Sequence, residues 1–387
     1  MIKCLLKKEY IQIYILMTFM SLFLFGKGIG LHYIIAPYLL IFSLLMLAFN
    51  KIYFLTKLLR WLMFLIPITL ISSLNFFYFN AHVYTYIQYV SYSLTGCIIA
   101  LVFYSFLQRY PHAITVVYYL FILFFILSVY RYFRSEDMRL IVGSDQHQNN
   151  AFYYVLMPLP LLLLVKSKII KCVSVSLVIL ICFLSLKRSA VIVISVITLM
   201  FLWFDILKGE KKILTFILFV FVFFIMYVYA DKLMFFERYE MLMTRLDSLS
   251  EDGGSGRTYI LERFWNYDID DLKQYPYSIF GKGFASVNNK YPDLIALHND
   301  WLEMFYSFGI SGLIIMLAFF VQLMKRLFFL YKSYNAIFVA YFSAVIIFFF
   351  YSFVGGVFSF LYLSLPLFCF FGVVEAIIVK KIDSNII

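Results

Sequence analysis

Long apolar runs separated by short polar breaks fill most of this chain, and they restrict its fold more than any motif does. A helix that crosses a bilayer needs about 20 mostly apolar residues. Backbone groups in lipid must be hydrogen-bonded within the protein, so these runs predict an all-α polytopic membrane protein with about 12 transmembrane helices. The candidate spans are residues 10–26, 30–49, 61–79, 84–107, 114–130, 151–165, 169–186, 189–207, 213–230, 301–324, 336–352 and 357–379.

The composition excludes a water-soluble protein. Of the 387 residues, 64% are hydrophobic and 21% aromatic, which is more than a water-facing surface tolerates. The net charge of +11 does not indicate a nucleic-acid partner, because the Lys and Arg residues lie in short clusters between apolar runs. Such clusters set topology and contact membrane lipids. The five cysteines have no metal-ligand spacing, and neither a metal nor a cofactor is expected.

Basic residues in the polar breaks predict which side each loop faces. The N-terminus is interpreted as a retained first helix, because no small-residue cleavage site follows its lysines. With that end cytoplasmic, 18 of the 32 Lys and Arg residues fall inside, six lie in short outside loops and eight in one long outside loop. The positive-inside rule then predicts both termini in the cytoplasm. The short run 151–165, with Pro158 and Pro160, is needed for this even number of spans.

One long polar segment, residues 231–298, carries 11 of the 21 acidic residues. A connector of this length is expected to fold and to carry function. It divides the chain into transmembrane helices 1–9 (1–230), a large periplasmic loop between helices 9 and 10 (231–298) and helices 10–12 (299–387). Within the loop, a helix is expected from about Gly256 to Lys273, with an apolar side suited to the membrane surface or to the helix bundle.

Three polar residues fall on the expected outer side: Arg188 in a tight turn between two spans, Arg257 after a glycine-rich break, and His298 where the tenth span begins. Two guanidinium groups can hold a phosphate or pyrophosphate through bidentate, charge-assisted hydrogen bonds. A histidine beside them can accept a proton near neutral pH. The three residue types together suit a site that binds a phosphate or pyrophosphate beside a proton acceptor.

Each of the three residues also has a structural alternative. Arg188 and the adjacent Lys187 are equally typical of an interfacial pair whose side chains reach toward water. Arg257 is equally typical of a solvated loop charge. His298 precedes an Asn and an Asp at a helix start, so it is also typical of a residue that flanks a helix cap.

Four other polar groups carry weaker signals. Asp268–Asp271 contains an Asp-x-Asp, which is more typical of a solvated helix end than of a cation site. Gly281–Gly283 is a Gly-Lys-Gly that suits an anion-cradling turn. Asp300 and Glu303 have the spacing of a capping box. The polar cluster Gln146–Asn150 suits either contact with sugar hydroxyls or a cap on the sixth span.

Taken together, these segments resemble the bacterial O-antigen ligase and polymerase family of membrane glycosyltransferases. The resemblance covers residues 140–330 and is most specific in the last of four stretches, which contains the family's His-Asn pattern and two glycines. The four stretches are SLKRSAVIV around Arg188, SGRTYILERFW around Arg257, IFGKGF at 279–284 and LHNDWLEMFYSFGISGLI at 297–314. The chain departs from the family at Asn149 and Asn150, where a Pro-Asn is often found.

The resemblance implies a GT-C-like transferase that moves a glycan from undecaprenyl pyrophosphate to a sugar acceptor at the periplasmic face of the inner membrane, without a metal. The acceptor is either a growing chain or the lipid A core. Arg188 and Arg257 match the arginines that hold the pyrophosphate, and His298 matches the histidine that activates the acceptor hydroxyl. Further candidates for acceptor contact or structural support are Asn299, Asp300, Arg263 and Asn149.

Three functions are compatible with these features. The sequence of the HNDWLEMFYSFG stretch favours a polymerase of O-antigen or capsule repeat units. A ligase that acts on the lipid A core uses the same donor chemistry and the same three residues. A polysaccharide or lipid transporter is the alternative from another class, but transporters place ionisable residues at mid-membrane. Here Asp205, Glu303 and Glu375 lie near the ends of the expected spans.

Overall fold

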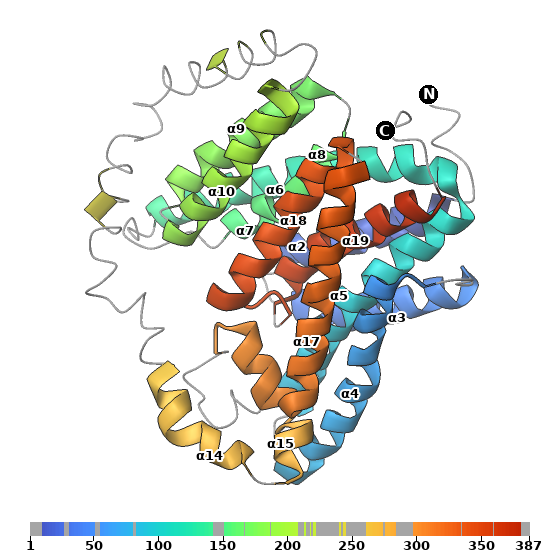
Figure 1. The fold of residues 1–387 in the computed structure, drawn as a ribbon, viewed down its shortest axis with the longest axis vertical. Helices are drawn as coiled ribbons and strands as arrows, with labels where there is room; N and C mark the ends of the chain where they lie inside the picture. Colours follow the sequence, from blue (N-terminus) through green and yellow to red (C-terminus); the bar gives the residue numbers. More distant parts are fainter. Residues whose placement is uncertain are drawn as a thin grey trace. The chain divides into compact units, whose positions relative to one another are not determined.

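The computed structural model of the chain is built of helices throughout its described residues (Figure 1). Two compact units divide the chain. The first comprises Met1–Ile114, Gly253–Arg326 and Phe348–Ile382, and the second comprises Thr115–Asp252, Leu327–Ile347 and Asp383–Ile387. The structure describes residues 10–26, 31–50, 55–79, 83–141, 151–165, 167–185, 187–207, 261–273, 275–283, 297–333, 335–358 and 360–380, and seven single positions between 213 and 244.

Helices in both units follow the expected apolar runs to within a few residues at most ends. Apolar runs form helices, as expected when lipid is the solvent, and α6 (Ile114–Ile141) continues past its apolar run through the charged residues after 130. In the first unit these helices are α2 (Ile11–Gly26), α3 (His32–Phe49), α4 (Lys57–Phe79), α5 (Val83–Arg109) and α19 (Leu361–Lys380). In the second they are α6 (Ile114–Ile141), α9 (Lys168–Leu184), α10 (Arg188–Phe201) and the π-helical η4 (Leu202–Leu207).

Five helices among the described residues are long and apolar enough to cross a membrane. The expectation of a polytopic helical membrane protein is thereby confirmed, whereas the number of twelve spans and the placement of the loops stay predictions. The five stretches are Val90–Arg109, Pro111–Ser135, Asp300–Ser333, Ile337–Val354 and Leu363–Lys380. Shorter apolar helical stretches, continuous or interrupted, cover Ile11–Phe25, Ile34–Phe49, Phe152–Leu163 and Ser189–Asp205.

The run 151–165 is not one continuous helix. It forms α7 (Phe152–Leu156) and α8 (Leu159–Leu163), which are separated at Pro158, and every residue of the run is buried. Proline lacks the backbone N–H that would continue the helix, and its ring clashes with the preceding turn. The expected ninth span, 213–230, lies outside the described residues apart from four single positions.

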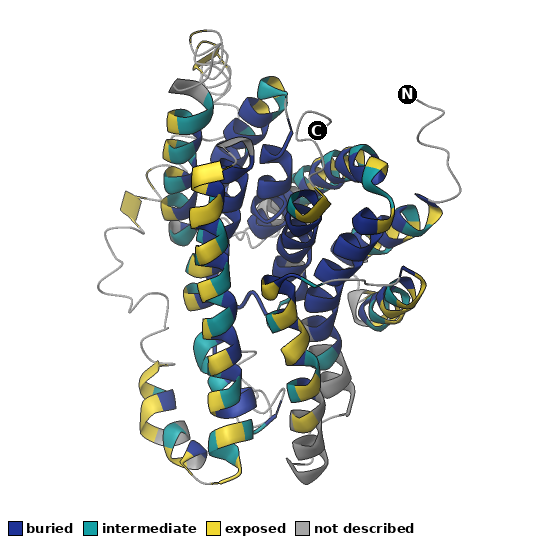
Figure 2. Cartoon of the chain, turned by 45° about the vertical axis from the view of Figure 1, so that its right-hand side comes forward, coloured by how far each residue is buried: buried dark blue, intermediate teal, exposed yellow. Residues whose placement is uncertain are grey.

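Close contact between α5 and α19 forms the interior of the first unit, drawn in dark blue in Figure 2. A Cβ on Gly372 would lie 2.1 Å from the Ala100 carbonyl oxygen, and one on Gly96 would lie 2.7 Å from Ser364 Oγ. Small residues let two helix backbones approach in this way, which is typical of helix pairs packed within a membrane. Any larger residue at Gly372 would push the two helices apart.

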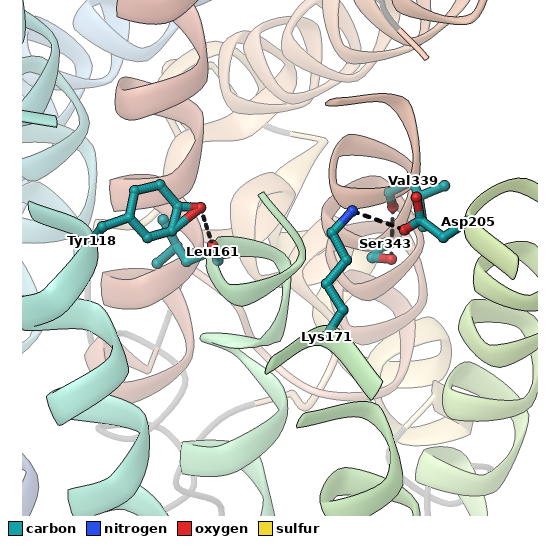
Figure 3. A network of polar contacts seen from close by, with 6 residues as sticks. All are labelled: Tyr118, Leu161, Lys171, Asp205, Val339 and Ser343. Carbon is teal, nitrogen blue, oxygen red and sulfur yellow. Dashed lines mark hydrogen bonds and ion pairs between the residues drawn. The ribbon is translucent and has the colours of Figure 1, made fainter. Parts of the chain in front are cut away.

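Each unit also contains an ion pair between helices. In the first unit, the Arg326 guanidinium binds both carboxylate oxygens of Glu375 at 2.7 Å, and the Glu375 side chain is fully buried. In the second unit, Lys171 Nζ lies 3.0 Å from Asp205 Oδ2 (Figure 3). Bidentate pairing satisfies several polar atoms at once, which buried charges require. Asp205 lies in η4, so its carboxylate is presented by a π-helical turn.

The helix that begins at Asp300 reverses direction at Gly309. α17 (Asp300–Ser333) has non-helical backbone angles at Gly309 (φ 64°, ψ −156°). The rings of Trp301 and Phe320 lie 6.3 Å apart, although 19 residues of straight helix would separate them by about 28 Å. A Cβ on Gly312 would lie 2.6 Å from the Met304 carbonyl oxygen, as expected if the two arms pack against each other. α17 is therefore a hairpin with a short arm, 300–308, and a long arm, 310–333 (Figure 1, orange).

Candidate functional site

His298 lies in a strained turn at the free end of the short arm of α17. Its φ of 52° is the only positive value at a non-glycine among the residues that the structure describes. A side chain in this region of backbone space costs energy, and such residues cluster at functional sites. The His298 side chain is exposed, and its ring stacks on Phe360 with 6.1 Å between centroids and 29° between planes. The turn therefore presents the imidazole outward instead of packing it into the core.

Asn299 is the residue that caps the short arm. Its Oδ1 accepts hydrogen bonds from the backbone N–H groups of Trp301 at 3.0 Å and Leu302 at 3.1 Å. These groups belong to the first turn of the helix and have no partner within it. Glu303 Oε2 accepts the Leu297 backbone N–H at 3.0 Å. The expected capping box of Asp300 and Glu303 is therefore wrong, because Asn299 is the cap and Glu303 binds the backbone N–H two residues before it.

Asp300 is fully buried and joins the short arm to the turn between α18 (Asn335–Val354) and α19. Its Oδ2 accepts the Val357 backbone N–H at 2.6 Å, and Oδ1 and Oδ2 lie 3.2 and 3.3 Å from the Phe358 N–H. Trp301 adds a second link, since its Nε1–H donates to Ser352 Oγ at 3.1 Å. The turn that contains Phe360 is therefore held beside His298 by the residues that follow His298.

Removing the Asp300 carboxylate is expected to loosen this arrangement. Hydrogen bonds to a charged group are worth about 1.5–3 kcal/mol each, so Asp300→Ala should destabilise the chain by roughly 3 kcal/mol and lower its transfer rate. Asp300→Asn keeps one carbonyl acceptor and should recover part of both losses. Denaturation midpoints in detergent and initial transfer rates measure the two effects. Equal stability of the Ala variant and the native chain would contradict the role given to Asp300.

The helix expected from about Gly256 to Lys273 is described from residue 261 onward and anchors the site from the other side. Residues 261–263 begin it, and η6 (Phe264–Asp268) and α14 (Ile269–Leu272) continue it. Phe264 and Leu272 pack with Leu297 and Tyr306 in one buried cluster. Leu297 directly precedes His298, so this contact fixes the chain on the N-terminal side of the turn. Arg263 is half-buried on the same helix.

The Gly-Lys-Gly segment does not form an anion cradle. The N–H groups of Lys282 and Gly283 donate to the carbonyls of Tyr306 and Ser307 at 2.8 and 2.9 Å, and the Gly281 N–H donates to Tyr277. The reversal at Gly309 ends the short arm and removes helical partners from its last carbonyls. The N–H groups of the Gly-Lys-Gly segment are the hydrogen-bond donors to these carbonyls. Its lysine ammonium lies 4.7 Å from the centre of the Tyr277 ring.

Arg188 is the first residue of α10, in the second unit. Lys187, directly before it, has extended backbone angles (φ −92°, ψ 103°) and is buried, with its ammonium 5.3 Å from the centre of the Tyr153 ring. The expected snorkelling of Lys187 toward water is therefore wrong, since a cation–π contact holds its side chain inside the protein. The turn places Arg188 where α10 begins.

The remaining candidates are either solvated or outside the described residues. Asp270 pairs with Lys273 at 2.6 Å, and both side chains are about 70% exposed, as a solvated helix end predicts. Within the described part of the chain, no group of three His, Cys, Asp or Glu residues has metal-site geometry. Arg257, Asn149 and the rest of the Gln146–Asn150 cluster lie outside the described residues.

The structure thus brings together His298, Asn299 and Asp300 with two features that the sequence did not reveal. One is the turn at 355–360, which supplies Phe360 to the His298 ring. The other is the reversal at Gly309, which returns the short arm toward that turn. A glycine pair at 355–356 and the Gly309-x-x-Gly312 spacing are the local signals that mark these two places.

A comparison with known protein families matches the segment that contains the His298 turn. The family model described as O-antigen ligase matches residues 173–317, a segment that includes Arg188, Arg257 and the whole His298 turn. No curated protein matches the chain significantly. The matched segment and the apolar helices support an O-antigen ligase/polymerase-type membrane protein. Residues 173–317 are therefore similar to the O-antigen ligase family, as the resemblance of the sequence motifs predicts.

Proposed function

We propose that the chain polymerises O-antigen or capsule repeat units at the periplasmic face of the inner membrane. The donor is an oligosaccharide linked to undecaprenyl pyrophosphate, and the acceptor is the terminal sugar of another lipid-linked chain. The observation that carries the proposal is the His298 turn, an exposed imidazole on strained backbone within the family segment. Exposure gives substrate access, and the bonds of Asn299 and Asp300 keep the turn in place.

The proposed reaction is a displacement at the anomeric carbon of the donor sugar. The acceptor hydroxyl attacks this carbon, and its proton passes to a ring nitrogen of His298. The bond between the anomeric carbon and the pyrophosphate oxygen breaks, and the electron pair leaves with undecaprenyl pyrophosphate. Proton acceptance by a positioned side chain contributes typically about 10²–10⁴-fold to a rate. Stacking on Phe360 orients the imidazole plane for this transfer.

Arg188 and Arg257 are proposed to bind the pyrophosphate of the donor. Negative charge grows on the leaving oxygen as the glycosidic bond breaks, and preorganised guanidinium groups stabilise that charge where water is partly excluded. Arg188 is the first residue of α10 and directly follows a lysine whose side chain contacts the Tyr153 ring. Arg257 precedes, in the sequence, the helix that anchors Leu297.

A ligase that transfers the finished glycan to the lipid A core is the second reading, favoured by the description of the matched family. The surface polysaccharide of a null strain separates the two. A single repeat unit attached to the core identifies a missing polymerase, whereas lipid-linked polymer with bare core identifies a missing ligase. Lipid-linked repeat units that accumulate on the cytoplasmic leaflet would instead indicate a transporter and refute both.

Metal removal is expected to leave the reaction unchanged. The two arginines supply the charge that a divalent ion would otherwise provide to the leaving group, and Asp270 of the Asp-x-Asp is engaged with Lys273. Purified protein, lipid-linked donor and excess chelator should give the same initial rate as the untreated reaction. Strong inhibition that added Mg²⁺ or Mn²⁺ reverses would make Asp268–Asp271 a cation site.

A further inference from the structure

The helix at residues 261–272 and α15 (Tyr277–Phe280) expose large apolar side chains on a surface that we name the aromatic shelf. Leu261 is 37% exposed, Trp265 56%, Tyr275 77% and Ile279 40%. Phe264, between the first two, is 1% exposed and packs into the cluster beneath His298. The segment therefore has one side fixed to the protein and another that displays aromatic and aliphatic groups.

The aromatic shelf is continuous with a lipid-facing row on α17. A Cβ on Gly309 would lie 2.5 Å from the backbone of Ile279, so α15 crosses α17 at the reversal. From the next residue onward, Ile310, Ile314, Leu317 and Val321 are 48%, 56%, 54% and 39% exposed. Their spacing of four, three and four residues places them on one face of the helix, and Figure 2 shows exposed positions recurring along this helix. An apolar row on a membrane span faces acyl chains.

Helix lengths indicate the depth of the aromatic shelf. The long arm of α17 has 24 residues, 310–333, and is about 36 Å long at 1.5 Å per residue. The hydrocarbon core of a bilayer is about 30 Å thick, and headgroup layers bring the total to about 40–45 Å. A core about 30 Å thick corresponds to about 20 helical residues, so residues 310–329 cross it. The exposed Lys325 then lies one turn inside one edge, where its long side chain can reach the headgroups. Ile310 lies at the other edge, which places α15 at the boundary between acyl chains and headgroups.

We propose that the aromatic shelf rests in the lipid headgroup layer of the leaflet nearest the His298 turn, with Trp265 and Tyr275 at the boundary between headgroups and acyl chains. Tryptophan and tyrosine favour this level because each has an apolar ring and one polar group. Lys273 and Asp270 are exposed and paired, as suits a wet side of the same segment. The partner of the shelf is thus the bilayer surface, and the shelf fixes the height of the site above it.

Tryptophan fluorescence tests this placement. The full chain is reconstituted in vesicles of phosphatidylethanolamine and phosphatidylglycerol that carry bromine either near the headgroup or near the end of the acyl chain. The variant W61F/W203F/W301F retains only Trp265. Headgroup-level bromine should quench its emission at least about twofold more than deep bromine, because tryptophan rings prefer the interface. Aqueous iodide should quench it less in vesicles than in detergent-free unfolded chain.

Two controls keep the outcome interpretable. The variant W61F/W203F/W265F retains only Trp301, whose ring lies against Phe353 and Phe320, and both bromine positions should quench it weakly. Comparing the native chain with W265F alone isolates the Trp265 component without three simultaneous substitutions. Free quenching by iodide in vesicles, with no effect of either bromolipid, would show that the shelf faces water or a protein partner. Stronger quenching by deep bromine would also overturn the proposal.

Discussion

Replacing His298 with alanine is expected to abolish long-chain glycan while leaving the amount of protein in the membrane unchanged. The imidazole is the proposed acceptor of the hydroxyl proton, and loss of such a base slows a reaction by about 10²–10⁴-fold. Gel profiles of surface polysaccharide and initial rates of the purified protein measure the effect. Lipid-linked repeat units should accumulate on the periplasmic leaflet, because the donor is still supplied and no longer consumed.

A second substitution separates the imidazole from the backbone turn that carries it. Glycine adopts a φ of 52° without strain, so His298→Gly should be at least as stable as His298→Ala and equally inactive. His112→Ala, at the 3-10 turn of Pro111–Ala113, is the matched control and should retain normal chains. An active glycine variant would show that the conformation of the turn, and not the imidazole, is what the reaction needs.

Arg188→Ala and Arg257→Ala are each expected to remove about 10²–10³-fold of the rate, the usual effect of losing one donor to a charge that develops in the transition state. Each variant should still reach the membrane in normal amount. Lysine keeps the positive charge but not the bidentate fork, so Arg188→Lys and Arg257→Lys should recover only part of the lost rate. Initial rates at saturating donor provide the measurement.

Arg60→Ala is the control for a surface arginine, since its side chain is exposed and donates to the nearby Leu55 carbonyl. Its glycan ladder should match that of the native chain. A normal ladder from Arg188→Ala or Arg257→Ala would remove that arginine from the mechanism. Normal ladders from both would leave the pyrophosphate without its proposed ligands, and the reaction scheme would fail.

The helices were predictable because backbone groups in lipid must be hydrogen-bonded within the protein. An apolar run has to be helical when no water is present to satisfy its backbone, so α5, α18 and α19 follow from counting apolar residues. The break between α7 and α8 in the short run 151–165 was also indicated by the sequence, because the run contains Pro158 and Pro160. These features depend on local composition, which sequence shows directly.

Pairing between distant segments was not predictable in the same way. Asp300 and Glu303 have capping-box spacing, yet Asp300 binds the N–H groups of Val357 and Phe358, more than 50 residues away. Gly281–Gly283 has the composition of an anion cradle, but the N–H groups of Lys282 and Gly283 donate hydrogen bonds to the carbonyls of Tyr306 and Ser307, just before Gly309. In each case a tertiary partner competes successfully for polar groups that local rules assign elsewhere, and only the folded chain reveals that partner.

The short arm of α17 acts as a spacer between the reversal at Gly309 and the imidazole at its far end. Inserting one residue into such a helix would move His298 by about 1.5 Å and swing it by about 100° around the arm. The distance between Gly309 and His298 can therefore change without rotating the imidazole only in steps of about one helical turn, or four residues. A related enzyme with a bulkier donor would have to lengthen the short arm by about four residues or change the conformation of the turn that carries the histidine.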